Sequence, residues 1–178
     1  MHNNHINYLL DKCKKIYTLY LLFLLKSGKH MKKTLAMLVV GLSLINNTFA
    51  LTIKQEDSNK QNVLEFYDKV VNQKDFDAAS AYLGSRYTQH NPNAADGPEG
   101  LKGFIQFLRD TYPDAHSEIK RVFAEGDYVI LHVHSIKVPG TRGQAIFDLF
   151  KLENGKIVEH WDAVQDVPEK SMNSNGMF

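Results

Sequence analysis

Apolar and polar positions alternate with a period of two through most of the second half of the chain. A period of two is typical of β-strands that bury one face. Short segments containing Gly, Pro, Asn or Asp separate the alternating runs, and links this short join neighbouring antiparallel strands. The pattern therefore predicts four strands in an antiparallel meander, at residues 117–124, 128–138, 144–152 and 156–164.

Before these strands the apolar positions follow a helical period. The first helix is expected from residue 61, and its apolar face comprises Val63, Phe66, Tyr67, Val70 and Val71. A second, short helix is predicted over 76–83, ending at Gly84, and a third begins near Pro98 and Glu99. Helices followed by strands predict an α+β fold with three helices packed on one face of a curved antiparallel sheet.

The first 50 residues have the features of a targeting sequence. In residues 31–50, two lysines precede an apolar run, and a small residue, Ala50, ends the segment, as in a secretory signal peptide. Residues 1–30 are interpreted as an upstream extension. A pair of membrane segments is the alternative, but each apolar run is shorter than the roughly 20 residues that span a bilayer. We expect cleavage at about Ala50, a tether over 51–60 and one domain over 61–178.

Charge and cysteine content narrow the class of partner. Beyond residue 50 the chain carries 14 Lys and Arg against 19 Asp and Glu, a formal net charge of −5. This sign disfavours nucleic-acid binding. The only cysteine is Cys13, so the cleaved chain would have neither a disulfide nor a thiol nucleophile. We predict a periplasmic or secreted protein without a membrane segment after cleavage.

Asp148, His160 and Asp162 interrupt the two apolar strands around Asn154-Gly155. Burying such groups is costly unless they have partners or a function. The turn admits two registers. In a three-residue loop Leu152 faces Lys156, and Asp148 lies opposite His160 on a face that includes Phe150 and Asp162. In a two-residue loop Asp148 moves to the other face. We favour the three-residue loop, because it gathers both carboxylates in one pocket.

Four other polar residues are candidates for the site. His132 and His134 point to one face of a strand, where they form either a hydrogen-bonded pair or two ligands of a metal. One strand supplies only two ligands, so we predict no metal. His90 and Asn91 end an extended run at Pro92, where they either stabilise the turn or face a ligand.

Carboxylates and imidazoles in an apolar setting suit proton transfer. Low polarity raises the proton affinity of a carboxylate, which then becomes an effective base for a carbon acid. For Asp148 the alternative is an ion pair with Arg142 or Lys151. Asp162 follows Trp161, so the two side chains point to opposite faces, and the alternative for Asp162 is a strand-end residue that accepts backbone hydrogen bonds.

Several motifs resemble the SnoaL-like polyketide cyclase family, in particular its branch of SnoaL-like aldol-condensation enzymes. The resemblance covers nearly all of residues 60–178. The motifs that carry it include Gln89-His90-Asn91-Pro92, Asp148-Leu149-Phe150 and Gly155-Lys156-Ile157-Val158-Glu159-His160-Trp161-Asp162. It implies the cone-shaped barrel of the nuclear transport factor 2 type, with an internal pocket, and a homodimer formed through the outer sheet face.

The resemblance also implies an enzyme that needs no cofactor and uses an aspartate as acid and base. That role falls on Asp162, with Asp148, His90 and His160 as catalytic partners; the expected substrate-binding residues are Asn91, His132, His134, Phe150 and Trp161. In this scheme His90 and Asn91 hold the carbonyl oxygen while Asp148 orients His160. The expected function is that of a lyase, cyclase or isomerase acting on a small carbonyl compound. The alternative is a non-catalytic binding protein for a small apolar ligand.

Overall fold

The structure is a computed structural model that describes residues 12, 14–19, 22, 48 and 50–178. The chain divides into two units, Met1–Ala50 and Leu51–Phe178, and the second contains the fold. The predicted signal peptide and upstream extension lie almost entirely outside the described residues, so they stay predictions. Within the described residues, no helix has the length and apolar character needed to cross a membrane.

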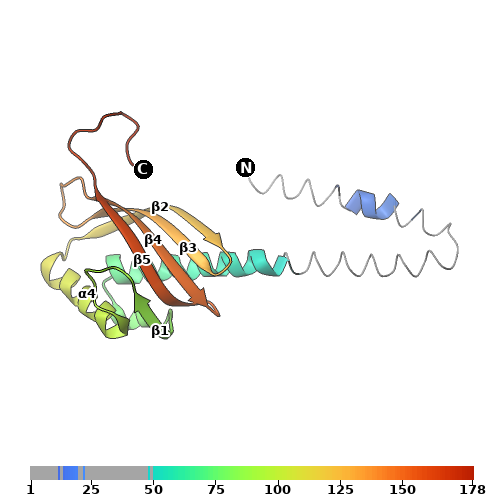
Figure 1. The fold of residues 1–178 in the computed structure, drawn as a ribbon, viewed down its shortest axis with the longest axis horizontal. Helices are drawn as coiled ribbons and strands as arrows, with labels where there is room; N and C mark the ends of the chain where they lie inside the picture. Colours follow the sequence, from blue (N-terminus) through green and yellow to red (C-terminus); the bar gives the residue numbers. More distant parts are fainter. Residues whose placement is uncertain (1–11, 13, 20–21, 23–47, 49) are drawn as a thin grey trace. The chain divides into compact units, whose positions relative to one another are not determined.

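Five strands form one mixed sheet in the order β1-β5-β4-β3-β2 (Figure 1). The predicted meander is confirmed: each of its strands pairs antiparallel with the next. The fifth strand, β1, was not predicted as part of the sheet; it pairs parallel with β5 at the sheet edge. The strands are β1 (Leu83–Gln89), β2 (His116–Glu125), β3 (Tyr128–Ile136), β4 (Gln144–Glu153) and β5 (Lys156–Asp166).

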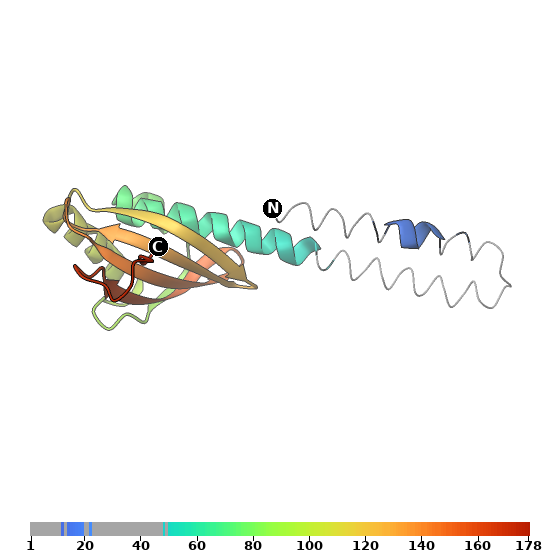
Figure 2. The same ribbon diagram turned by 90° about the horizontal axis from the view of Figure 1, so that it is seen from above.

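The helices lie on one side of this sheet (Figures 1 and 2). A long helix covers 51–67 and continues into a π-helical turn, η1 (Asp68–Asn72). Two further helices follow, α3 (Phe76–Ser80) and α4 (Gly97–Thr111). The second helix ends earlier than predicted because Gly84 belongs to β1, where an added Cβ would lie 2.6 Å from the Val158 side chain.

Residues 51–60 are helical, in contrast to the predicted tether. Their polar side chains hold the turn between β2 and β3: Asn59 is fully buried and donates to the Gly126 carbonyl at 3.3 Å, and Glu56 accepts from the Gly126 amide at 2.8 Å. Apolar periodicity does not reveal a helix that is held by such polar contacts.

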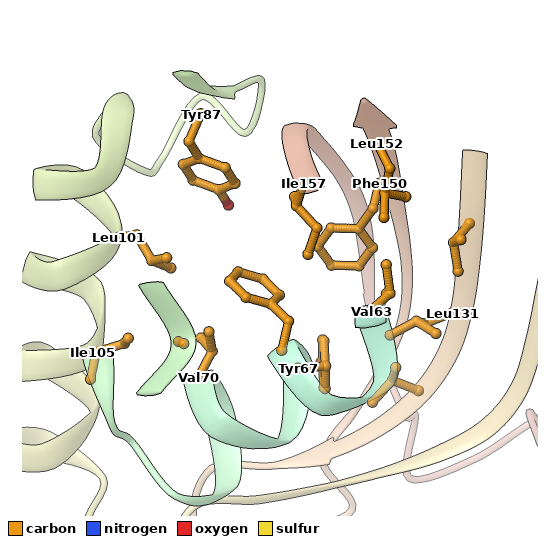
Figure 3. Packing of buried hydrophobic residues seen from close by; sticks show 14 residues of the cluster. Val63, Tyr67, Val70, Tyr87, Leu101, Ile105, Leu131, Phe150, Leu152 and Ile157 are labelled. Atoms are coloured by element: carbon orange, nitrogen blue, oxygen red, sulfur yellow. The ribbon is translucent and has the colours of Figure 1, made fainter. Parts of the chain in front are cut away.

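The core lies between the long helix, α4 and the inner face of the sheet (Figure 3). The predicted helix face is largely confirmed, since Val63, Phe66, Tyr67 and Val70 are at most 6% exposed. The sheet contributes alternate residues of β3 and the end of the β4–β5 hairpin. These are Val129, Leu131, Val133, Phe150, Leu152 and Ile157.

The register of the β4–β5 hairpin differs from the prediction. Leu152 pairs with Ile157 and Glu153 with Lys156, so the loop has two residues, Asn154 and Gly155, both with positive φ. The preferred three-residue loop is therefore wrong. A register shift follows immediately, between Lys151 and Leu152.

This shift inserts one extra residue, Val158, into β5 as a bulge. One extra residue returns the following side chains to their original face. Asp148 consequently lies opposite Asp162, and Phe150 opposite His160, all on the inner face. The predicted common face is present, although the predicted pairing of Asp148 with His160 is not.

The α+β class with helices packed on an antiparallel meander is confirmed. The sheet, however, stays open: β1 and β2 are its two edges in the described residues, and it does not close into a barrel. Because the sheet is open, the helices have to cover one side of the inner pocket.

Candidate functional site

A cavity of about 180 Å³ opens between the helices and the inner face of the sheet. Most of its lining is apolar and comes from the long helix, α4, β4 and β5. Polar side chains enter it chiefly from the sheet side. Its polar lining residues include Tyr67, Tyr87, Gln89, Asn91, Asp148, His160 and Asp162.

Asp148, His160 and Asp162 form a compact cluster in the cavity wall, with one potential ligand atom from each within 4.8 Å of the others. Asp148 is 5% exposed and His160 8%, whereas Asp162 is half-buried. His160 Nε2 lies 3.0 Å from Asp148 Oδ1. The partner of Asp148 is therefore His160, and Lys151 instead pairs with Glu159 on the outer face.

Gln89, the last residue of β1, and Asn91, two residues beyond it, supply side chains that hold this cluster. In an extended strand alternate residues share a face, so Gln89 and Asn91 both point inward. The Asn91 side-chain amide donates to both oxygens of Asp162, at 2.7 and 2.8 Å. Gln89 Oε1 lies 3.1 Å from His160 Nδ1 and also accepts from the Asn91 backbone amide at 2.9 Å.

These contacts fix where the protons of His160 lie. An amide oxygen only accepts hydrogen bonds, so the Nδ1 atom that faces Gln89 carries a hydrogen. The opposite nitrogen, Nε2, faces a carboxylate oxygen of Asp148 at 3.0 Å. A hydrogen bond between those two atoms requires one proton, held either by the imidazole or by the carboxyl group. Asp148 and His160 thus act as a pair that stores one proton.

Burial is the main reason why the pKa of Asp148 lies above its ordinary value of 3.8. The hydrogen bond and charge of His160 oppose this rise, and the nearby Asp162 carboxylate adds to it. The Tyr67 hydroxyl also lies near Asp148 and lowers the pKa of its carboxyl group slightly. Oδ2 of Asp148 nevertheless has no partner in normal hydrogen-bonding geometry.

Two tyrosine hydroxyls face the same cavity and stay protonated. Burial raises the pKa of Tyr67 and of Tyr87 well above the usual value of 10.0, and the charges of Asp148 and Asp162 raise both further. The hydroxyl of Tyr87 points into the space between α4 and the sheet (Figure 3). Both groups are therefore available as hydrogen-bond donors at any ordinary pH.

Two predicted site residues, His90 and Trp161, lie on the opposite face of the sheet. They stack on each other with ring centroids 4.3 Å apart, and His90 Nε2 lies 3.2 Å from Glu159. Neither residue lines the cavity. Consecutive residues of a strand point to opposite faces, which is why Asn91 and Asp162 enter the cavity while their neighbours do not.

His132 and His134 also lie on the outer face. His132 stacks on Phe147 at 4.5 Å and contacts Arg121 at 2.9 Å, and His134 contacts the Arg142 carbonyl at 2.8 Å. The ring of the C-terminal Phe178 covers both histidines. Phe150, in contrast, lines the cavity beside His160, at 4.7 Å between ring centroids.

The cluster also has the composition of a metal site, because a histidine nitrogen and two carboxylates suit divalent metals. Most of its atoms, however, already have hydrogen-bond partners: Asn91 engages both oxygens of Asp162, and Gln89 engages Nδ1 of His160. Among the carboxylate oxygens of the cluster, Oδ2 of Asp148 is the one without a hydrogen-bond partner.

Three residues of the site, Gln89, Tyr67 and Tyr87, were not predicted from the sequence. Tyr67 was assigned to the helix core, and it is indeed buried there. Gln89 and Tyr87 share the alternation of Asn91, so a strand period extended back from Asn91 would have identified both.

Comparisons with known proteins agree with this architecture. The sequence model for the SnoaL-like polyketide cyclase family matches residues 61–169. No functionally curated protein matches the chain.

Among solved structures, the chain is similar to TsrD from Streptomyces laurentii, with 21% identity and a TM-score of 0.51 over 60% of this chain and 87% of that one. It is also similar to a candidate polyketide cyclase from Acidithiobacillus ferrooxidans (21%, 0.52, 60% and 87%) and to another from Bacillus cereus (23%, 0.52, 60% and 74%). These likenesses establish the fold. The family match, which covers more than half of the chain, shows that the chain belongs to the SnoaL-like polyketide cyclase family.

Proposed function

We propose that the domain is a cofactor-independent enzyme that transfers protons on a small carbonyl compound, as a lyase, cyclase or isomerase. The observation that carries this proposal is the cluster of Asp148, His160 and Asp162 in the wall of an apolar cavity. An apolar setting makes a carboxylate a stronger base than it is in water. Membership of a cyclase family supports the same class of chemistry.

Asp162 is the proton acceptor in this proposal. It is half-buried and lines the cavity, so a ligand can reach it. The Asn91 amide holds both of its oxygens and thereby fixes the orientation of the carboxylate. The Asp148–His160 pair stores a proton within the same cluster. The site therefore has both a base and a proton source, as general acid–base chemistry requires.

Removing a proton next to a carbonyl group moves negative charge onto the carbonyl oxygen. From the sequence, we expected His90 and Asn91 to stabilise that oxygen. His90 lies on the outer face, and the Asn91 amide is engaged with Asp162. Tyr67 and Tyr87 are better placed, because both hydroxyls face the cavity and burial keeps them protonated. Fixed donors of this kind stabilise developing oxyanions.

Hydrogen–deuterium exchange at carbon tests the proposal without knowledge of the natural substrate. The purified domain is incubated in D₂O with acetophenone, whose ring suits a cavity of about 180 Å³, and loss of the methyl proton signal is followed by NMR. We expect faster exchange with the wild type and background exchange with Asp162→Asn. The control is Asp114→Asn, an exposed aspartate that does not line the cavity. Wild-type exchange at the background rate, or equal exchange in Asp162→Asn, would refute the role of Asp162.

A chelator arm tests independence of a metal. Exchange in the presence of EDTA should equal exchange without it. Loss of exchange with EDTA, and its recovery on addition of a divalent metal, would instead assign the cluster to a metal.

The second candidate function is a non-catalytic binding protein, favoured by the apolar lining of the cavity. Recovery of a bound compound unchanged after long incubation would support it. We also propose that the protein is exported to the periplasm or the medium. N-terminal sequencing of the exported protein should then begin at about Leu51.

A further inference from the structure

We propose that the cavity takes an elongated keto acid, whose carboxylate binds Lys137 at one end while its carbonyl group lies toward Asp162 at the other. This inference names the substrate class of the site, and it rests on the proposed function in placing the carbonyl group at Asp162. It comes from the unequal distribution of charged side chains along the cavity wall.

Lys137 is the one lysine or arginine among the described residues that line the cavity. It follows β3, in which Val133 and Ser135 are buried on the inner face, and strand alternation places Lys137 on the same face. The side chain is exposed, and no ion pair engages its ammonium group within the part of the chain that the structure describes. A ligand can therefore reach this cation.

Lys137 lies where the cavity meets the surface. A second pocket of about 430 Å³ adjoins the cavity, and both are lined by Ser135, Lys137 and Gln144, which together form the cavity mouth. The acidic residues of the second pocket, Asp166 and Glu169, do not line the cavity. At the mouth, then, the charge that faces the cavity is positive.

The acidic cluster lies away from the mouth. Asp162 pairs with Asp148, and Asp148 pairs with Leu131 on β3. Lys137 comes six residues after Leu131, and six residues of a strand span about 20 Å between Cα atoms. The apolar side chain of Ile146 lines the wall between the two ends. A ligand that meets both Asp162 and Lys137 must therefore be elongated, with an apolar middle.

This separation of charge fixes the orientation of an anionic ligand. Like charges repel, so a carboxylate is disfavoured beside Asp148 and Asp162 and favoured beside Lys137. At the mouth the carboxylate also stays in contact with water, which avoids the cost of burying a charge. The uncharged carbonyl end of the same molecule then occupies the acidic end, where Asp162 reaches the cavity.

An acid and its methyl ester test this inference, because they differ chiefly in charge. The probes are 4-acetylbenzoate and methyl 4-acetylbenzoate, and their dissociation constants are measured by NMR titration of the isotope-labelled domain. With the wild type we expect the acid to bind about threefold to fivefold more tightly than the ester, as a partly exposed ion pair provides. Isotope-filtered NOE spectra should place the acetyl methyl group of the acid near Phe150, at the acidic end of the cavity.

The diagnostic variant is Lys137→Gln, which removes the charge from an exposed side chain. It should abolish the preference for the acid and leave the affinity for the ester within about twofold, whereas Lys137→Arg should keep the preference. The matched control is Lys54→Gln, which changes the net charge by the same amount at an exposed position that does not line the cavity. It should keep the wild-type preference.

An acid that binds the wild type no better than its ester would overturn the proposal. An unchanged preference in Lys137→Gln would overturn it as well, and so would NOE contacts that place the acetyl methyl group beside Ser135. Because binding is measured without turnover, this inference and the proposed catalytic role of Asp162 fail in different experiments.

Discussion

The proton on Nδ1 of His160 depends on one side chain, Gln89. Replacing it by methionine keeps the length of the side chain and removes the oxygen that faces Nδ1 at 3.1 Å and the Asn91 amide at 2.9 Å. Without that acceptor, the favoured position of the hydrogen is Nε2, where it can be donated to Asp148. We therefore predict that Gln89→Met switches the neutral imidazole of His160 from the Nδ1–H to the Nε2–H tautomer.

The cost in stability follows from the same contacts. Two hydrogen bonds worth about 1 kcal/mol each are lost, and the Asn91 backbone N–H that is left without an acceptor adds up to about another 1 kcal/mol. The free energy of unfolding should fall by about 2–3 kcal/mol. With an unfolding entropy of about 2.1 cal/mol/K per residue, this lowers the Tm of the unit Leu51–Phe178 by roughly 7–11 °C.

Long-range ¹H–¹⁵N correlation spectra of the histidine side chains measure the tautomer directly. Wild-type His160 should show a protonated Nδ1, and Gln89→Met an unprotonated one. Thr88→Val is the matched control, because Thr88 is the preceding residue of β1 and points to the other face. An unprotonated Nδ1 in the wild type would refute the assignment of the proton pair. A loss of stability without a tautomer change would reduce Gln89 to a packing role.

Two further predictions concern pH and assembly. Burial raises the pKa of Asp148 above 3.8, so the folded state keeps a proton that the unfolded state loses, and the contribution of Asp148 to stability falls as the pH rises above that value. In urea unfolding, the free energy of unfolding of Asp148→Asn minus that of the wild type should therefore be larger at about pH 7 than at about pH 4. A smaller value at pH 7 than at pH 4 would contradict this sign. We also predict a homodimer through the outer sheet face, because Phe123 and Phe147 are 56% and 50% exposed there. Phe123→Lys should shift sedimentation toward the monomer, whereas Phe107→Lys on α4 should not, and a wild type that sediments as a monomer would exclude the dimer.

Periodicity in the sequence predicted most of the fold because apolar burial dominates the positions of the elements. The strands of the meander and the buried face around Phe66 and Val70 follow directly from it. Apolar periodicity did not predict the helix over 51–60, because Asn59 and Glu56 hold it through contacts with a turn far along the chain. The extended run before Pro92 was predicted, but its parallel pairing with β5 was not, because β5 is distant in sequence.

Alternation also accounts for which candidate site residues reach the cavity. In both QHN and HWD motifs the outer two residues point inward and the central one points outward. His90 and Trp161, the central residues, stack on each other outside. A motif that is read as a block of polar residues therefore assigns too many of them to the site, whereas the strand period separates the inward-facing residues from the outward-facing ones.

The hairpin shows where local rules stop being sufficient. The Asn-Gly turn favours a two-residue loop, and such a loop alone would have moved His160 and Asp162 to the face opposite Asp148. The bulge at Val158 corrects the face within one residue pair. Turn chemistry is local, but the bulge is stabilised from outside the hairpin: Val158 is buried and packs at Gly84, where only a glycine leaves room for its side chain. The inward positions of His160 and Asp162 thus depend on a bulge that packs against an edge strand outside the hairpin, and Gly84 leaves the room that Val158 occupies there.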